Sequence, residues 1–172
     1  MTRSRRGSGG PGPRNRGRNA PGGDAPGRNA PSGRALGVDL GSRRIGVALS
    51  DSHGTVATPY ETAQRSGDRG RDHRRLADLV AEAEARVVVV GLPLSLDGTV
   101  GPAAQGVLDE VAELRTALPV EVVTWDERLS TVEAERSLRT MNVRRGDRRR
   151  VVDRLAATVI LQSWLDAGQP RG

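Results

Sequence analysis

The chain contains 172 residues, and its 27 basic residues are all arginine, against 21 acidic residues, for a formal net charge of +6. It has no cysteine, which excludes disulfides and thiolate metal sites, and its two histidines are too few for a histidine-rich metal site. Any resident metal must therefore be held mainly by carboxylates, which favours Mg²⁺ or Mn²⁺. No run approaches the ~18 apolar residues of a membrane span, so we expect an intracellular protein without membrane association.

The excess positive charge lies in the N-terminal segment. Residues 1–33 contain seven arginines and one acid, so the rest of the chain carries 20 arginines and 20 acids and is neutral. This segment also contains nine glycines and five prolines, and it cannot bury enough apolar surface to offset its ordering entropy. We therefore expect a disordered basic tail over 1–33, one folded domain over 34–168 and a short C-terminal tail over 169–172.

The folded part begins with three expected strands. Residues 35–40 and 45–50 are apolar runs separated by a Gly-Ser-Arg-Arg turn, which is the pattern of a β-hairpin. A third strand is expected over 56–64, where Pro59 favours an edge position. Three consecutive strands indicate an antiparallel start to the sheet.

The next elements alternate between helix and strand. Apolar positions recur at helical spacing over 71–85, and the following run, 87–91, is apolar on both faces, as in a buried parallel strand. A helix over 102–118 and a buried strand over 120–125 repeat this pattern. The order of elements therefore predicts an α/β fold with a mixed sheet flanked by helices.

The last part of the chain is expected to be helical around an arginine-rich connection. A capping-box pattern predicts a short helix over 130–139, and residues 141–150 are expected to form a polar linker with five arginines. The final helix is expected over 151–167. Because it is apolar nearly all round, it should be largely buried.

Four acidic residues interrupt or end these apolar elements: Asp39, the neighbours Asp126 and Glu127, and Asp153 in the first turn of the expected final helix. If they converge, they can share one or two divalent cations, which activate water for attack on a phosphodiester. Ordinary turn, N-cap or helix-start roles remain the alternative for each acid. Alternation along a strand turns Asp126 and Glu127 to opposite faces, so only one can be a direct ligand, and Glu127 is favoured.

Arginines next to these acids suit contacts with a phosphate backbone, although a solvated linker is the alternative explanation for the largest cluster. The chain has no Phe and only three aromatic residues, so base-stacking platforms are not expected and recognition should be mainly of backbone and shape. The candidate phosphate contacts are Arg43, Arg44, Arg128, Arg144, Arg145, Arg148, Arg149 and Arg150.

Four segments of the chain resemble the YqgF/RuvX family, a group of Holliday-junction-resolvase-like and pre-16S rRNA nucleases with an RNase H-like fold. The segments span nearly the whole folded part in the order of the family, and they are residues 37–51, 90–99, 126–134 and 152–162. The N-terminal tail lies outside the resemblance.

The resemblance implies an RNase H-like, RuvC-like fold, with a mixed central sheet flanked by helices. It also implies that the protein is a metal-dependent nuclease. Its acidic metal ligands would be Asp39, Glu127 (or Asp126) and Asp153. It also implies a cytoplasmic role in maturing the 5′ end of the 16S rRNA precursor.

The sequence leaves the substrate open between structured RNA and branched DNA. A Holliday-junction-resolving DNA endonuclease is therefore an alternative, and a non-catalytic RNA-binding ribosome assembly factor is another. An ATP-binding protein of the actin-like sugar-kinase group has a similar first phosphate loop, but it requires two such domains where this chain supplies one. The sequence does not distinguish a monomer from a homodimer.

Overall fold

The computed structural model describes residues 33–129 and 148–168, and for residues 148–153 it describes the backbone only. A five-stranded sheet has the order β3-β2-β1-β4-β5. β1 and β2 are antiparallel, as are β2 and β3, whereas β4 is parallel to both β1 and β5. The predicted mixed sheet is confirmed, with Pro59 in the edge strand. The strands are β1 (Arg34–Leu40), β2 (Arg44–Ser50), β3 (Ala57–Gln64), β4 (Ala85–Leu92) and β5 (Glu121–Asp126).

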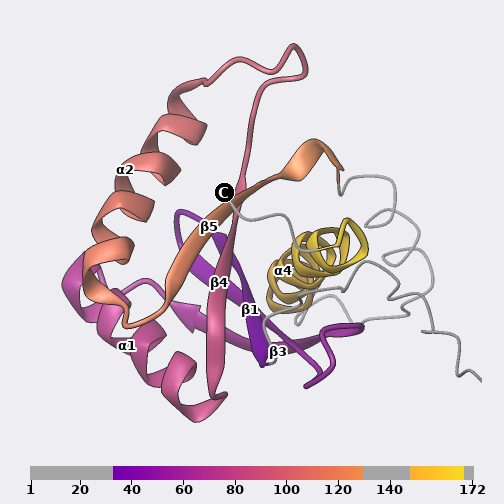
Figure 1. The fold of residues 1–172 in the computed structure, drawn as a ribbon. Coiled ribbons are helices and arrows are strands. Elements are labelled where there is room, and N and C mark those ends of the chain that lie inside the picture. The colour runs from indigo at the N-terminus through magenta and orange to yellow at the C-terminus, as the bar shows by residue number, and fades with distance from the viewer. Residues whose placement is uncertain (1–32, 130–147, 169–172) are drawn as a thin grey trace, which may run out of the picture.

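Helices cover both faces of the sheet (Figure 1). α1 (Arg69–Glu82) and α2 (Pro102–Ala117) lie on one face, and α4 (Arg148–Asp166) lies on the other. A short 3-10 turn, η1 (Glu127–Leu129), follows β5. None of the helices in the described part of the chain is long and apolar enough to span a bilayer. The predicted short helix over 130–139 lies outside the described residues, as do the predicted tails apart from Gly33.

The final helix begins earlier than the sequence indicated. α4 starts at Arg148, so Arg148, Arg149 and Arg150 belong to its first turn and not to a polar linker. Arginine is a good helix former, and a run of charges does not end a helix as glycine or proline does. Asp153 consequently lies in the second turn of α4 instead of the first.

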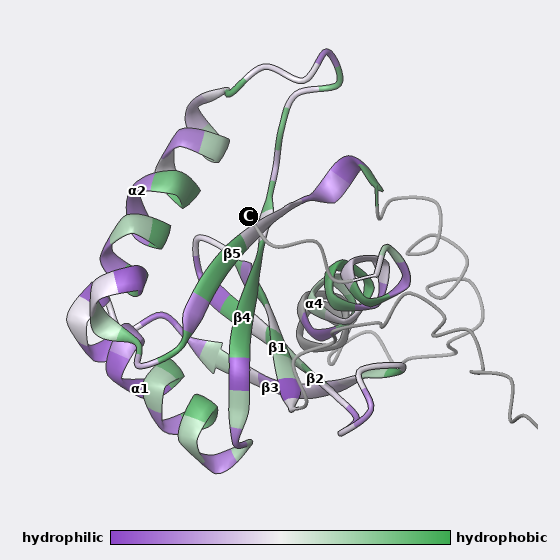
Figure 2. Ribbon diagram, in the orientation of Figure 1, coloured by the Kyte–Doolittle hydropathy of each residue, from purple (hydrophilic) through white to green (hydrophobic). Residues whose placement is uncertain are grey.

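Two apolar cores lie on opposite faces of the sheet. Val88 and Val90 of β4 belong to the core under α1 and α2, whereas Val87 and Val89 belong to the core under α4. Successive residues of β4 thus alternate between the two cores, which explains why this strand is apolar on both faces (Figure 2). The expected burial of α4 is also confirmed, because none of its side chains from 154 to 165 is exposed.

α4 approaches β1 closely because Gly37 has no side chain. A Cβ at Gly37 would lie 2.6 Å from the Cβ of Leu161 and 2.7 Å from the carbonyl oxygen of Ala157. A second point of attachment is the Gln162 side chain, whose oxygen accepts a hydrogen bond of 2.8 Å from the backbone N–H of Ala57 in β3. These contacts fix α4 across the first three strands.

Candidate active site

The predicted acids of the first and last strands meet at one edge of the sheet. β1, β4 and β5 run parallel to one another, so their carboxyl ends lie at the same edge. Asp39 is the second-last residue of β1, and Glu127 directly follows β5. In open α/β sheets, ligands usually bind at this edge.

Asp39 faces the side of the sheet that α4 covers. Ala35 and Gly37, four and two residues earlier in β1, both pack against this side. Leu36 and Val38 belong instead to the core under α1 and α2. Because side chains alternate along a strand, Asp39 follows Ala35 and Gly37 towards the α4 side.

Glu127 reaches the same side and lies over the central strand. Trp125, two residues earlier, packs against the core under α4. A Cβ at Gly91 of β4 would lie 2.6 Å from Oε1 of Glu127 and would also collide with the Ile160 side chain of α4. Glycine at position 91 therefore leaves the room that the Glu127 carboxylate occupies.

Asp39 and Glu127 are close enough for their charges to interact. Val38 pairs with Val90 in the parallel register of β1 and β4, so Asp39 is level with Gly91, over which Glu127 lies. Burial raises the pKa of Glu127, and the negative charges of Asp39 and Asp126 raise it further, to about 7. At neutral pH, such a carboxylate is stabilised by taking up a proton or by a nearby cation.

Asp126 has a different environment from its neighbour Glu127. Its carboxylate accepts a hydrogen bond of 3.0 Å from the backbone N–H of Arg128, and bonds of 2.9 and 2.6 Å from Nε and Nη2 of that side chain. The hydrogen bonds from Arg128 hold the pKa of Asp126 below its usual value. Asp126 is thus engaged by a guanidinium, whereas Glu127 lies near a second carboxylate.

The structure brings two of the three predicted acids together. Asp153 lies in α4, four residues before Ala157, and the carbonyl oxygen of Ala157 approaches Gly37 of β1. The side chain of Asp153 itself lies outside the described residues. Among the side chains that the structure describes, no group of three His, Cys, Asp or Glu residues could hold a metal ion. Asp39 and Glu127 supply two oxygen ligands of the type that Mg²⁺ binds, so this edge fits a divalent cation that has a further ligand.

The structure describes the side chains of three of the predicted phosphate contacts, Arg43, Arg44 and Arg128. Arg43 is exposed in the turn between β1 and β2, and Arg44 begins β2 half-buried. The Arg128 guanidinium is engaged by Asp126 and also donates to the carbonyl oxygen of Leu96 at 3.4 Å. The remaining candidates have side chains outside the described residues: Arg144, Arg145, Arg148, Arg149 and Arg150.

A buried ionic cluster beside the β1–β2 turn was not found by sequence reasoning. Arg65 donates hydrogen bonds of 2.6 and 2.9 Å to the two carboxylate oxygens of Glu110, and its Nε donates to the carbonyl oxygen of Gly41 at 3.0 Å. Asp72 lies 3.5 Å from the Arg65 guanidinium, and His73 lies 3.4 Å from Glu110. The cluster therefore fixes the turn that directly follows β1 to α1 and α2.

The position of Glu110 in the sequence indicates that it needs a partner of opposite charge. It lies among Val107, Val111 and Leu114 on the buried face of α2, and a buried acid requires a partner. Burial opposes the ionisation of Glu110, yet the hydrogen bonds and charge of Arg65 outweigh it and lower the pKa of Glu110. The partner could not be identified because it is 45 residues away in the chain.

A cavity lies next to the same cluster, on the side of the sheet covered by α1 and α2. Its volume is about 510 Å³, and its lining includes Gly41, Ser42, Pro93 and Glu110. Neither Asp39 nor Glu127 lines this cavity. The acid pair and the cavity thus share an edge of the sheet but open on opposite faces.

Comparison with known proteins identifies the family to which the chain is similar. A sequence model of the RuvX family, described as "Holliday junction resolvase", matches residues 33–167. A Mycobacterium sp. (strain KMS) protein named "Putative pre-16S rRNA nuclease" is 52% identical over 132 residues, which cover 76% of this chain and 78% of that protein. A protein of the same name from Halalkalibacterium halodurans is 44% identical over 135 residues, covering 78% and 96% respectively.

A solved structure shares the fold at low sequence identity. Thermus thermophilus RuvC in complex with a Holliday junction substrate superposes with a TM-score of 0.52 at 13% identity, covering 79% of this chain and 97% of that chain. The predicted RuvC-like fold is therefore confirmed. With the family match over residues 33–167 and relatives at about half identity, the chain belongs to the RuvX family.

Proposed function

We propose that this protein is a metal-dependent nuclease that hydrolyses phosphodiester bonds of the 16S rRNA precursor. The observation that carries the proposal is the Asp39–Glu127 pair, in which burial and the Asp39 charge raise the pKa of Glu127 to about 7. Perturbed carboxylates of this kind are typical of catalytic and metal sites. The names of the relatives at 52% and 44% identity support RNA as the substrate.

Asp39 and Glu127 would hold Mg²⁺ or Mn²⁺, with Asp153 as the third ligand. The bound ion would lower the pKa of a water molecule and stabilise the leaving oxygen. Glu127 must give up its proton when it becomes a ligand, so metal binding at neutral pH is coupled to proton release. Gly91 keeps the Glu127 carboxylate beside Asp39 by leaving space above β4.

The basic side chains around this edge would hold the phosphate backbone. Arg43 is exposed in the turn that follows Asp39, and Arg148, Arg149 and Arg150 form the first turn of α4. Contacts of this kind position the nucleic acid without reading its sequence, and they weaken as salt is added. A precursor-rRNA substrate would place the protein in the cytoplasm.

Single-turnover cleavage of a 16S precursor fragment with its 5′ extension tests the proposal. Asp39→Asn should lose at least about 10³-fold in rate, which corresponds to roughly 4 kcal/mol of transition-state stabilisation, while RNA binding is retained. Asp109→Asn, an exposed aspartate on α2, is the matched control and should cleave like the wild type. Cleavage that persists in Asp39→Asn, or in wild type with EDTA, would contradict the proposal.

Branched DNA is the second candidate substrate, favoured by the description of the family as Holliday junction resolvases and by the RuvC-like fold. Precursor RNA and a four-way DNA junction, compared at one salt concentration, separate the two substrates. Faster cleavage of the junction would favour DNA. Binding of RNA without metal-dependent cleavage of either substrate would favour a non-catalytic assembly factor.

A further inference from the structure

The loop between β4 and α2 presents an apolar side chain to solvent beside the proposed active site. This loop projects beyond the edge of the sheet (Figure 1). Leu96, at its tip, has 97% of its surface exposed. A single exposed leucine is common on protein surfaces, so what distinguishes Leu96 is its attachment to the segment that carries Glu127.

Hydrogen bonds fix the turn that carries Leu96. The backbone N–H of Gly98 donates to the carbonyl oxygen of Ser95 at 2.8 Å, and the backbone N–H of Ser95 donates to the carbonyl oxygen of Thr99 at 3.0 Å. The Asp97 carboxylate accepts hydrogen bonds of 3.0 and 2.7 Å from the backbone N–H and the hydroxyl of Thr99. Gly98 has a φ of +87°, which glycine adopts without strain. Leu96 is therefore held outward by an ordered turn.

The same turn is attached to the segment that carries Glu127. Arg128, which directly follows Glu127, donates from Nη1 to the carbonyl oxygen of Leu96 at 3.4 Å. Asp126 holds the Arg128 guanidinium in place through its own hydrogen bonds. Leu129, in the same 3-10 turn, is 63% exposed. Two exposed leucines with an arginine between them thus lie next to the proposed catalytic glutamate.

Nucleic acid suits this surface better than a protein partner does. Neither the loop after β4 nor the 3-10 turn contains an aromatic residue, and the three aromatic residues of the chain, Tyr60, Trp125 and Trp164, pack against the two cores. Apolar side chains such as leucine can insert between stacked bases and open the step. A stable protein interface would need roughly 1,000 Å² of complementary surface, whereas this tip offers isolated leucines beside charges.

We propose that Leu96 inserts into the base stack where a paired and an unpaired RNA strand meet, and so determines specificity for structured RNA. The contact between Arg128 and the Leu96 carbonyl links the turn that carries this side chain to the segment of Glu127. The opened strand would then run towards Asp39 and Glu127. This inference rests on the proposed nuclease function and adds the substrate class: RNA with a helix end next to the cleavage site.

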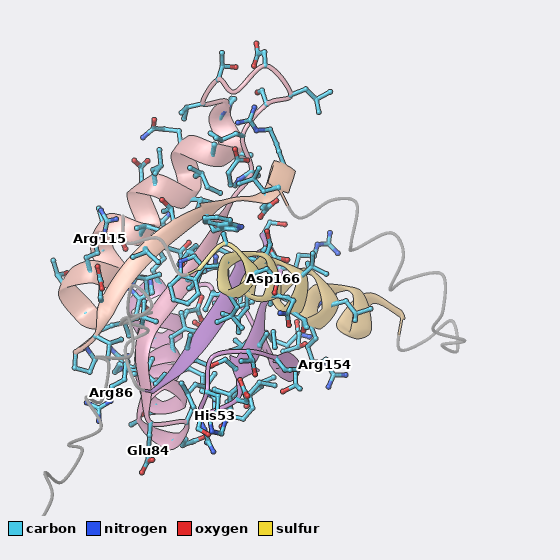
Figure 3. The ribbon with its side chains drawn as sticks, turned by 45° about the vertical axis from the view of Figure 1, so that its right-hand side comes forward. His53, Glu84, Arg86, Arg115, Arg154 and Asp166 are labelled. Carbon is cyan, nitrogen blue, oxygen red and sulfur yellow. The ribbon has the colours of Figure 1, made fainter. Side chains whose placement is uncertain are left out.

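Leu96→Ala is the test variant, Leu96→Met should retain function, and Val56→Ala is the matched control. Val56 is 53% exposed but lies in the β2–β3 turn. His53, in that turn, lies at the opposite end of the molecule from the loop after β4 (Figure 3). Each protein is assayed with Mn²⁺ on a hairpin that has a single-stranded 5′ extension, and on an unpaired RNA of the same cleavage-site sequence.

Leu96→Ala should cleave the hairpin about 10-fold more slowly than the wild type, which corresponds to a loss of about 1.4 kcal/mol. It should cleave the unpaired RNA at a rate within about twofold of the wild type. Equal losses on both RNAs, or no loss on either, would overturn the inference. Absence of cleavage by the wild type would instead contradict the proposed nuclease function.

A second measurement does not depend on cleavage. A 2-aminopurine placed at the helix end of the hairpin becomes brighter when it is unstacked, and this can be followed in EDTA. Wild type, Leu96→Met and Val56→Ala should increase the fluorescence on binding, whereas Leu96→Ala should bind with little increase. An undiminished increase with Leu96→Ala would show that another side chain opens the step.

Discussion

Glu110 is buried and Glu127 is half-buried near the same edge of the sheet, on opposite faces, and their surroundings have opposite charge. Arg65 donates two hydrogen bonds to Glu110 and lowers its pKa against the effect of burial. Burial raises the pKa of Glu127, and the nearby Asp39 and Asp126 charges add to the increase. The first glutamate is neutralised within the protein and stabilises the fold. The second lies near like charges, so a proton or a bound cation would stabilise it, as at a metal site.

The largest expected effect comes from removing the charge of Glu127. Glu127→Gln should reduce metal-dependent cleavage by at least about 10³-fold, because one of the proposed metal ligands is lost. Asp126→Asn should reduce it far less, because Asp126 is engaged by Arg128. Single-turnover rates of the two variants provide the comparison. Equal losses would place both neighbouring carboxylates in the site.

Removing the guanidinium from the other glutamate should destabilise the protein without touching the acid pair. Arg65→Met leaves Glu110 buried beside Asp72, and we expect the free energy of unfolding to fall by about 3 kcal/mol. The double variant Arg65→Met, Glu110→Met should recover part of this loss, because the charges of the Arg65–Glu110 pair are removed together while that of Asp72 remains. Urea unfolding measures both values. A single variant as stable as the wild type would contradict the compensation described for Glu110.

The pH dependence of stability should separate the two glutamates as well. The pKa of Glu127 is raised from 4.5 to about 7 in the folded protein. Below pH 4.5 the group is protonated in both states, and as pH rises to about 7 the unfolded state ionises first, so the folded state loses stability. Because Glu127 is only half-buried, solvent screening should limit this loss to about 2 kcal/mol in EDTA, and the loss should be absent in Glu127→Gln. Mg²⁺ should reduce it in the wild type, and parallel pH profiles of the two proteins would contradict the raised pKa.

A smaller effect is expected from filling the space above β4. A methyl group at position 91 would meet the Glu127 carboxylate and the Ile160 side chain. Gly91→Ala should therefore lower the free energy of unfolding by about 1–2 kcal/mol and slow cleavage about 10-fold by displacing the carboxylate. Gly106→Ala is a control, since a Cβ there has no neighbour within 4 Å. Unchanged cleavage by Gly91→Ala would show that Glu127 can move without loss.

Local patterns in the sequence were sufficient for the strands and for placing Asp39 and Asp126 near the ends of two of them. Pro59 predicted the edge strand because proline cannot donate to a ladder, and alternation predicted that Asp126 and Glu127 diverge, although β5 ends at Asp126. The start of α4 was predicted wrongly, because its first turn consists of arginines that resemble a linker in composition. Helix propensity was the better guide there.

Contacts between distant residues could not be predicted from such patterns. The Arg65–Glu110 pair joins the end of β3 to the middle of α2, and no periodicity specifies which arginine a buried glutamate will meet. The space over Gly91 is a similar case, because a glycine at the end of a strand is usually explained by the following turn. Both features depend on packing between elements that are far apart in the chain.

The position of α4 in the chain determines when the face of the sheet that bears Asp39 is covered. Among the described elements, α4 follows all five strands in the chain, yet it packs against β1, β2 and β3, which are synthesised before it. Until α4 arrives, the face of the sheet that bears Asp39 has no cover and the proposed third ligand, Asp153, is missing. On the proposed function, a chain that still lacks α4 should therefore not cleave RNA.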